Sequence, residues 1–130
     1  MQTPLILKYR EGKNDKADWF EVVEPVTVEL SDGKILTIPQ FYVTDFASVP
    51  RFMWSLIPPI GKYNRACLVH DYLYDTQYRQ KELGTYNARK FADREMLRIA
   101  NNSNPKDKVL HFVMYQMVRY FGLRAWRNKK

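Results

Sequence analysis

A histidine and an aspartate side by side, His70-Asp71, lie in the segment RACLVHDYLYD and form the pattern best suited to chemistry. On a helix, neighbouring residues are turned by about 100° from each other, so the two side chains face different partners. A neutral imidazole can activate water as a general base when a carboxylate on a facing helix fixes its tautomer. Asp93 is our candidate for that carboxylate.

Asp71 would have a separate task. Together with backbone carbonyls of the preceding loop, its carboxylate could hold a hard cation, a geometry typical of Ca²⁺, and such an ion would polarise an ester carbonyl. The competing interpretation is structural: His70 is satisfied by a neighbouring carboxylate, Asp71 is solvated, and Asp93 is an exposed helical residue near Arg89 and Arg94.

Three other residues allow a chemical interpretation, but the structural one is favoured for each. Asp45 in TDFASVP could be a third site carboxylate, or it could bond to local backbone. Ser48 lacks the flanking glycines of a nucleophile elbow and is expected to cap a helix. Cys67 lies one helical turn before His70 and would need a stabilised thiolate, so a buried core position is expected. Two His and one Cys are too few for a typical zinc site, although two His and two Asp could hold another divalent ion.

The elements that must position these residues fit one α+β domain over residues 1–130, mainly β over 1–46 and mainly α over 47–130. Hydrophobic residues make up 45% and charged residues 27%, which is ordinary globular composition. Residues 5–44 are rich in β-branched side chains. Within them, VTVELSDGKILTIP places Asp32-Gly33 between two alternating runs, which predicts an antiparallel β-hairpin in a small sheet.

The second part predicts helices. A short helix is expected over FMWSLI, and one of about four turns over RACLVHDYLYDTQYR. A loop around Leu83-Gly84-Thr85 should separate it from a helix over NARKFADREMLRIA, and the short connection predicts an antiparallel helical hairpin. Asn104-Pro105 opens a C-terminal helix. The apolar positions of that last helix are Leu110, Val113, Met114, Met117, Val118 and Phe121.

The succession HDYLYD, LGTYN and FADREM resembles the core of secreted and parvoviral phospholipases, which cut the sn-2 ester. These enzymes share an HDxxY helix, a turn and a second helix bearing the dyad aspartate. Over residues 62–97 the resemblance implies that His70 is the general base, Asp93 the dyad carboxylate and Tyr74 a supporting hydrogen-bond donor. It also implies Ca²⁺, with Asp71 as a ligand and the preceding IPPIGKYN contributing Gly61.

A longer stretch, from TDFASVPRFMWSLIPPIGKYNRACLVHDYLY to Ala92-Asp93, is similar to the phage and prophage family called domain of unknown function 1353. This second resemblance implies phage origin and a shared architecture, without an agreed activity. Together the two resemblances predict a phage-encoded, phospholipase-like hydrolase. The alternative is a non-catalytic virion, tail-associated or accessory host-interaction protein that keeps the helical hairpin as a scaffold.

The charge of the chain indicates its partners, and its cysteine content and apolar runs indicate its compartment. The net charge of +7 favours an anionic surface, and the segment RYFGLRAWRNKK interleaves basic and aromatic residues. We expect a phospholipid membrane surface or phage tail and virion proteins as partners; nucleic acid is disfavoured because no base-reading motif is present. A single Cys, no secretory signal and no apolar run of membrane-spanning length predict the host cytoplasm or association with the virion.

Overall fold

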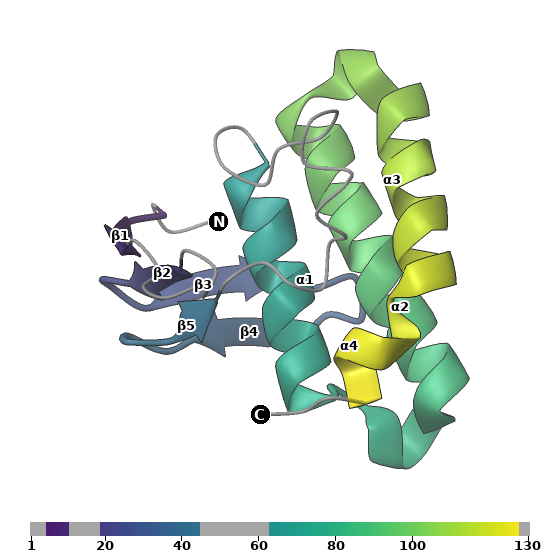
Figure 1. The fold of residues 1–130 in the computed structure, drawn as a ribbon, viewed down its shortest axis with the longest axis horizontal. Helices are drawn as coiled ribbons and strands as arrows, with labels where there is room; N and C mark the ends of the chain where they lie inside the picture. Colours follow the sequence, from purple (N-terminus) through teal and green to yellow (C-terminus); the bar gives the residue numbers. More distant parts are fainter. Residues whose placement is uncertain (1–4, 11–18, 45–62, 128–130) are drawn as a thin grey trace. The chain divides into compact units, whose positions relative to one another are not determined.

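The structure is a computed structural model, which describes residues 5–10, 19–44 and 63–127. The chain divides into two compact units, Met1–Asp45 and Phe46–Lys130. This division lies next to the boundary between the β-rich and the helix-rich parts that the sequence predicts. Strands precede helices along the chain (Figure 1), so the predicted α+β class is confirmed.

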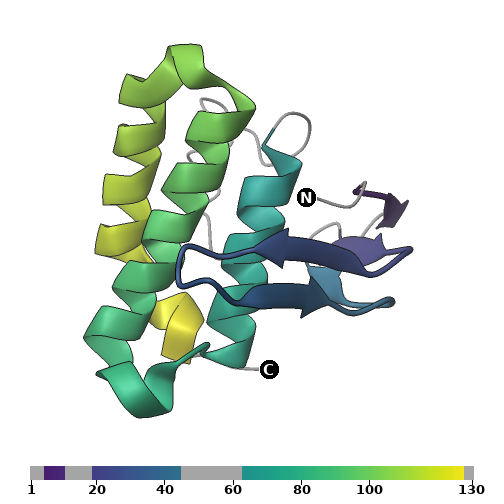
Figure 2. The same ribbon diagram turned by 180° about the vertical axis from the view of Figure 1, so that it is seen from behind.

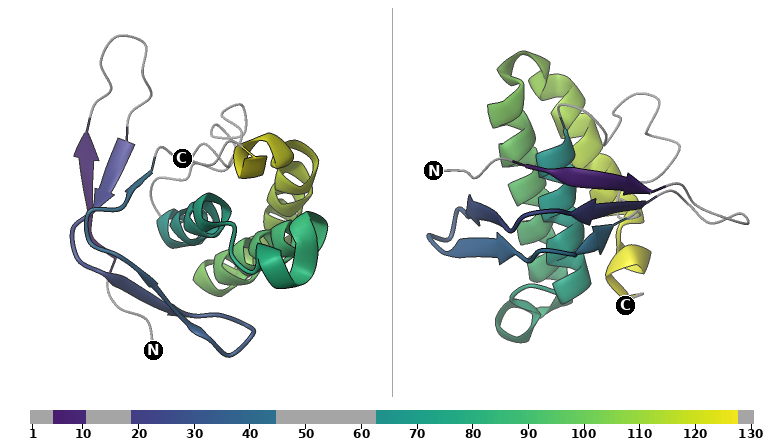
Figure 3. Two further views of the ribbon diagram at one scale, coloured as in Figure 1. Left: turned by 90° about the horizontal axis from the view of Figure 1, so that it is seen from below. Right: turned by 90° about the vertical axis from the view of Figure 1, so that its left-hand side faces the viewer.

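The first unit holds a three-stranded antiparallel sheet. Its central strand β2 (Trp19–Val22) pairs on one side with β1 (Leu7–Arg10) and on the other with the short β5 (Val43–Thr44). The register places Leu7 opposite Val22, and Phe20 opposite both Tyr9 and Thr44. Figure 3 shows these strands side by side.

The predicted hairpin is confirmed in the same unit. Strands β3 (Val26–Glu29) and β4 (Ile35–Ile38) pair antiparallel, with Val26 opposite Ile38. Gly33 adopts a φ of +84°, which a glycine allows at no steric cost, and the amide of Lys34 donates to Asp32 Oδ1 at 2.9 Å. Alternate residues of both strands are buried, as the period of two requires. The buried ones are Val26, Val28, Leu36 and Ile38.

The second unit is built on the helical hairpin of α1 (Asn64–Thr76) and α2 (Gln80–Ser103), which run antiparallel (Figures 1 and 2). The break between them differs from the predicted loop at residues 83–85. It lies at residues 77–79, where Gln77 and Arg79 take left-handed backbone angles without a glycine. The predicted break at Gly84 is also present, because this residue, at φ +81° and ψ 165°, interrupts the helical geometry and kinks α2.

Two further helices complete this unit. A 3₁₀ turn (Pro105–Asp107) follows Asn104 and leads into α3 (Lys108–Phe121), which packs against α2; the short α4 (Leu123–Arg127) packs against α1. The core between the helices is made of apolar side chains from all four. Its fully buried members include Leu68, Leu73, Met96, Ile99, Met114, Val118 and Trp126.

The apolar positions of α3 lie on more than one side of the helix. Met114 and Val118 are buried, whereas Val113 and Phe121 are exposed. The predicted short helix over FMWSLI lies outside the described residues. Within the described ranges, no helix is long and apolar enough to cross a membrane.

Candidate functional site

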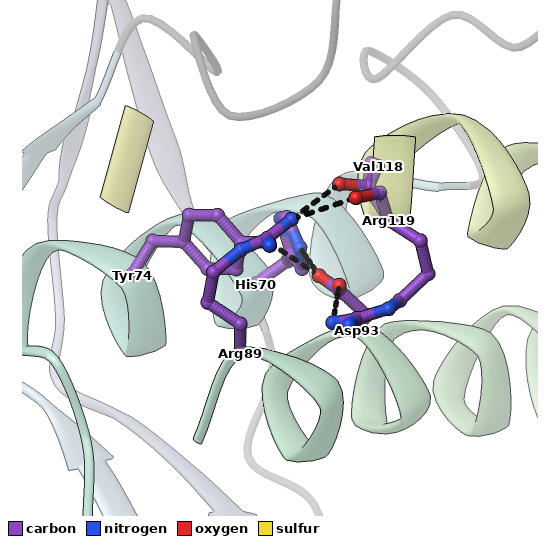
Figure 4. A network of polar contacts seen from close by, with 6 residues as sticks. All are labelled: His70, Tyr74, Arg89, Asp93, Val118 and Arg119. Carbon is purple, nitrogen blue, oxygen red and sulfur yellow. Dashed lines mark hydrogen bonds and ion pairs between the residues drawn. The ribbon is translucent and has the colours of Figure 1, made fainter. Parts of the chain in front are cut away.

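His70 on α1 and Asp93 on α2 form a buried hydrogen-bonded pair. The distance from His70 Nε2 to Asp93 Oδ1 is 2.6 Å, and both side chains are 0% exposed. Figure 4 shows the two side chains pointing toward each other from the facing helices. The structure therefore brings together the two residues that the sequence named as base and carboxylate. It does not place Asp93 on the surface, as the structural interpretation had it.

Tyr74 completes this contact from the same helix as His70. Residues four apart lie on one face of a helix, so Tyr74 lies beside His70, with ring centroids 4.2 Å apart and the ring planes tilted by 38°. Its hydroxyl donates to Asp93 Oδ1 at 2.7 Å. One oxygen of the carboxylate thus accepts hydrogen bonds from both α1 side chains.

The other oxygen of Asp93 is bound from α3. Arg119 Nη1 donates to Asp93 Oδ2 at 2.9 Å, and the Arg119 guanidinium also lies 4.9 Å from the centre of the Tyr86 ring. The sequence listed Arg119 only among the basic residues near the C-terminus. Its approach to Asp93 depends on the packing of a third helix, and we find no local pattern that predicts it.

These contacts set the charges of the site. Burial raises the pKa of Asp93, but the hydrogen bonds from His70, Tyr74 and Arg119 outweigh burial and hold this pKa below its ordinary value. Burial and the nearby Asp93 charge raise the pKa of Tyr74. Burial lowers the pKa of Arg119, but its bond to Asp93 outweighs that and raises it. At neutral pH the site therefore contains a carboxylate, a phenol and a guanidinium.

The ionised carboxylate determines how the proton sits on His70. A carboxylate oxygen only accepts hydrogen bonds, so Nε2 of His70 must be the donor in the contact with Asp93. The tautomer is assigned from this bonding pattern. In a neutral ring with the proton on Nε2, the basic atom is Nδ1.

Arg89 supports the site from α2, one turn before Asp93. Its side chain is buried, and its Nη2 donates to the carbonyls of Val118 at 3.1 Å and Arg119 at 2.9 Å (Figure 4). These carbonyls belong to the last turn of α3, where a cation is favoured by the helix dipole. Arg89 Nε also approaches the Tyr74 hydroxyl, at 3.4 Å. The guanidinium thereby fixes the end of α3 that carries Arg119.

Gly122 leaves room for this junction. A Cβ atom at this position would overlap the Val118 carbonyl oxygen and lie 2.6 Å from the Tyr74 hydroxyl and 3.2 Å from Arg89 Nη2. In the structure Gly122 follows the last residue of α3 and leaves room for the Val118 backbone carbonyl, the Tyr74 hydroxyl and the Arg89 guanidinium.

The predicted cation ligands are not gathered in the described part of the chain. Asp71 lies on α1 and is buried, so the expectation of a solvated side chain is wrong. Gly61, Asp45 and Ser48 lie outside the described residues. Among residues 5–10, 19–44 and 63–127, no three His, Cys, Asp or Glu side chains stand together as a metal group would require. Ca²⁺ takes six to eight oxygen ligands, and of the predicted ones only Asp71 lies in the described part of the chain.

Cys67 has the properties of a core residue. Its side chain is fully buried, and burial, with a smaller contribution from the Asp71 charge, raises the pKa of the thiol to about 12. A thiol with this pKa is protonated at neutral pH and is a poor nucleophile. The structure thus agrees with the structural interpretation of Cys67.

His111 forms a separate polar cluster in the same unit. Its Nδ1 lies 2.7 Å from Asn101 Oδ1, and its Nε2 lies 2.8 Å from the Tyr63 hydroxyl. Asn104 donates to Tyr63 at 3.4 Å and to Asp107 at 2.6 Å. His111 is therefore a second buried, hydrogen-bonded histidine, without a carboxylate on its ring nitrogens in these contacts.

Comparison with known proteins gives one family match and no match to a curated protein or a solved structure. Residues 20–118 match the model of a family described as "Protein of unknown function (DUF1353)". The matched segment contains His70, Tyr74, Arg89 and Asp93, and Arg119 directly follows it. Since the match spans well over half of the 130 residues, the chain belongs to the DUF1353 family.

Proposed function

We propose that this chain is a phage-encoded, phospholipase-like hydrolase that cleaves a carboxylic ester with a water molecule. His70 Nδ1 takes a proton from the water as its oxygen attacks the ester carbonyl carbon. The imidazolium then returns that proton to the departing alkoxide oxygen, so that a fatty acid and an alcohol are released. Asp93 holds the ring by its Nε2 proton and stabilises the positive charge that develops on it.

The observation that carries the proposal is the contact between His70 Nε2 and the ionised Asp93 carboxylate. This contact directs the basic nitrogen of His70 away from Asp93, which is the arrangement a general base requires. Tyr74 and Arg119 bind the same carboxylate and restrict its movement. Three helices thus position one imidazole, and rigid support of this kind is what catalytic groups need.

The choice of a phospholipid ester has two supports. One is the resemblance of HDYLYD and FADREM to the phospholipase core, because His70, Tyr74 and Asp93 are the residues on which that resemblance depends. The other is the net charge of +7, which would raise the local concentration of a chain near anionic phospholipid.

The proposed mechanism contains no step through a cation, because the loop before α1, whose carbonyls the predicted Ca²⁺ site requires, lies outside the described residues. A role for Asp71 and Gly61 in binding Ca²⁺ remains a separate proposal from the resemblance. It predicts that millimolar Ca²⁺ raises the melting temperature of the wild type, since a ligand that binds the native state stabilises it. Asp71→Asn would abolish the rise. An equal rise in both proteins would place the ion elsewhere.

One observation favours a second candidate, a non-catalytic phage virion, tail-associated or accessory protein. His70 and Asp93 are both 0% exposed, and a hydrolase must admit water and substrate to its base. A buried pair whose carboxylate accepts hydrogen bonds from α1 and α3 can instead fix the packing of α1, α2 and α3. In that case the pair serves the fold alone and its loss affects only stability.

Fatty-acid release from ester-linked phosphatidylglycerol vesicles separates the two candidates. We expect release by the wild type and a loss of at least about a hundredfold for Asp93→Asn, which removes the charge that orients and supports the imidazole. Circular dichroism must show the variant folded at the assay temperature. No release by the folded wild type would support the scaffold and contradict the hydrolase.

A further inference from the structure

Helix α3 carries a second apolar face, opposite the one it buries. Its buried residues are His111, Met114 and Val118. On the other side, Val109 and Tyr120 are 81% and 80% exposed, and Phe112 and Val113 are also exposed. Their spacing of three, four and seven residues places the four side chains in one stripe along the helix. We call these four residues the α3 stripe.

This pattern is unusual for a helix at the surface of a folded unit. A helix that buries one face normally carries polar side chains on the other. Single exposed apolar residues are common, but a contiguous apolar stripe marks a surface that contacts something else. The α3 stripe spans about three turns, and the exposed Gln116 is the polar residue within it.

A hollow with basic side chains in its lining lies at each end of the stripe, with one such residue at the C-terminal end and three at the other. At the C-terminal end, a hollow of about 600 Å³ is lined by Arg119 with Gln116, Met117, Tyr120 and Phe121. At the other end, a hollow of about 480 Å³ includes Arg94, Arg98 and Lys108 in its lining. Lys108 stands four residues before Phe112, so the basic and apolar parts share one side of the helix.

The charge of residues 108–130 indicates which kind of partner the α3 stripe would contact. From residue 108 to the end there is no Asp or Glu; the basic residues are Lys108, Arg119, Arg124, Arg127, Lys129 and Lys130. A second copy would bring the same positive charge against this face, and that repulsion disfavours a dimer. An apolar stripe between cations matches a bilayer surface instead, with side chains among the acyl chains and Lys or Arg at the phosphates.

We propose that the α3 stripe and its flanking cations bind the surface of an anionic phospholipid membrane, with α3 lying in the plane of the interface. The role of this membrane binding rests on the proposed function, because the membrane is where the hydrolase would meet its phospholipid substrate. Arg119 lines the hollow beside the stripe and also binds Asp93, so the membrane surface and the His70 site share one side chain.

Binding is measured by flotation of the full chain with vesicles of ether-linked phosphatidylcholine, with or without ether-linked phosphatidylglycerol. Ether lipids have no ester to cleave, so binding is separated from turnover. We expect association with the phosphatidylglycerol vesicles that weakens as salt is raised. Phe112→Ser combined with Tyr120→Ser should weaken it by roughly tenfold or more, because both side chains would enter the interface. Lys108→Glu should weaken it at low salt.

Ile35→Ser is the matched control, because Ile35 is 61% exposed but lies on β4, away from the stripe in sequence. It should bind as the wild type does. Wild-type binding by the Phe112/Tyr120 double variant would overturn the inference, and so would a gel-filtration dimer that this double variant abolishes. Binding to ether vesicles without fatty-acid release from ester vesicles would support the inference and contradict the hydrolase. Fatty-acid release from ester vesicles that the Phe112/Tyr120 double variant leaves unchanged would support the hydrolase and contradict the membrane-binding inference.

Discussion

Arg119 Nη1 lies 2.9 Å from Asp93 Oδ2, and this ion pair joins α3 to the carboxylate that His70 contacts. The family match ends at residue 118, so the cation that balances Asp93 comes from the residue just beyond it. Because Asp93 is fully buried, its charge depends on this partner and on the bonds from α1. The ion pair is therefore part of both the fold and the site.

Replacing Arg119 with Met should destabilise the chain by about 3 kcal/mol. This is the lower end of the cost of breaking a buried pair, because Asp93 keeps its bonds from His70 and Tyr74. Urea unfolding measures the change. The control is Glu82→Gln, which removes a 2.7 Å ion pair with Arg79 at the surface and should cost about 0.5 kcal/mol or less. Equal costs would contradict the special position of Arg119.

Asp93 should make the chain sensitive to acid. The pKa of Asp93 in the folded state lies below the ordinary aspartate value of 3.8. The ionised Asp93 carboxylate therefore makes its full contribution to the free energy of unfolding above pH 3.8. This contribution is lost as the pH falls from there through the folded-state pKa. Urea unfolding at a series of pH values from neutral to acid should show a steeper decline for the wild type than for Asp93→Asn. Identical declines would mean that the Asp93 pKa is not lowered.

Gly122→Ala should cost about 3 kcal/mol, because the new methyl group overlaps the Val118 carbonyl and crowds the Tyr74 hydroxyl. Gly33→Ala provides the comparison. Gly33 has a φ of +84° but nothing within 4 Å of a Cβ atom, so only the backbone cost of about 1 kcal/mol applies. Thermal or urea unfolding of the two variants tests the difference, and a milder effect at position 122 than at position 33 would contradict the close approach.

Cys67 should resist thiol reagents in the folded chain. Burial raises its pKa to about 12, so almost no thiolate is present at pH 8. Labelling with a disulfide reagent should be slow in buffer and fast in concentrated urea. Cys67→Ser should keep whatever ester hydrolysis the wild type has. Rapid labelling of the native chain, or loss of hydrolysis in the folded variant, would revive Cys67 as a nucleophile.

The sequence predicted the features that depend on neighbours along the chain. Asp32-Gly33 indicated the turn, and helical spacing put His70 and Tyr74 on one face of α1. The break at Gln77 and Arg79 was missed because neither residue type signals a left-handed backbone.

Other features depend on packing between helices. Arg119 lies 26 residues from Asp93, and only the placement of α3 brings them together. On α3 itself, apolar residues occur on two opposite faces, so their periodicity could not select the buried one. The apolar positions named from the sequence therefore include both the buried Met114 and the exposed Val113 and Phe121.

The most direct measurement compares two buried histidines of the same unit. His70 contacts Asp93, whereas His111 contacts Asn101 and Tyr63, so His70→Ala and His111→Ala each remove a hydrogen-bonded imidazole. Fatty-acid release from phosphatidylglycerol vesicles is measured where circular dichroism shows both variants folded. The hydrolase predicts a fall of about 10²- to 10⁴-fold for His70→Ala and a rate near wild type for His111→Ala. Equal rates for the two variants, or no release by the wild type, would contradict it.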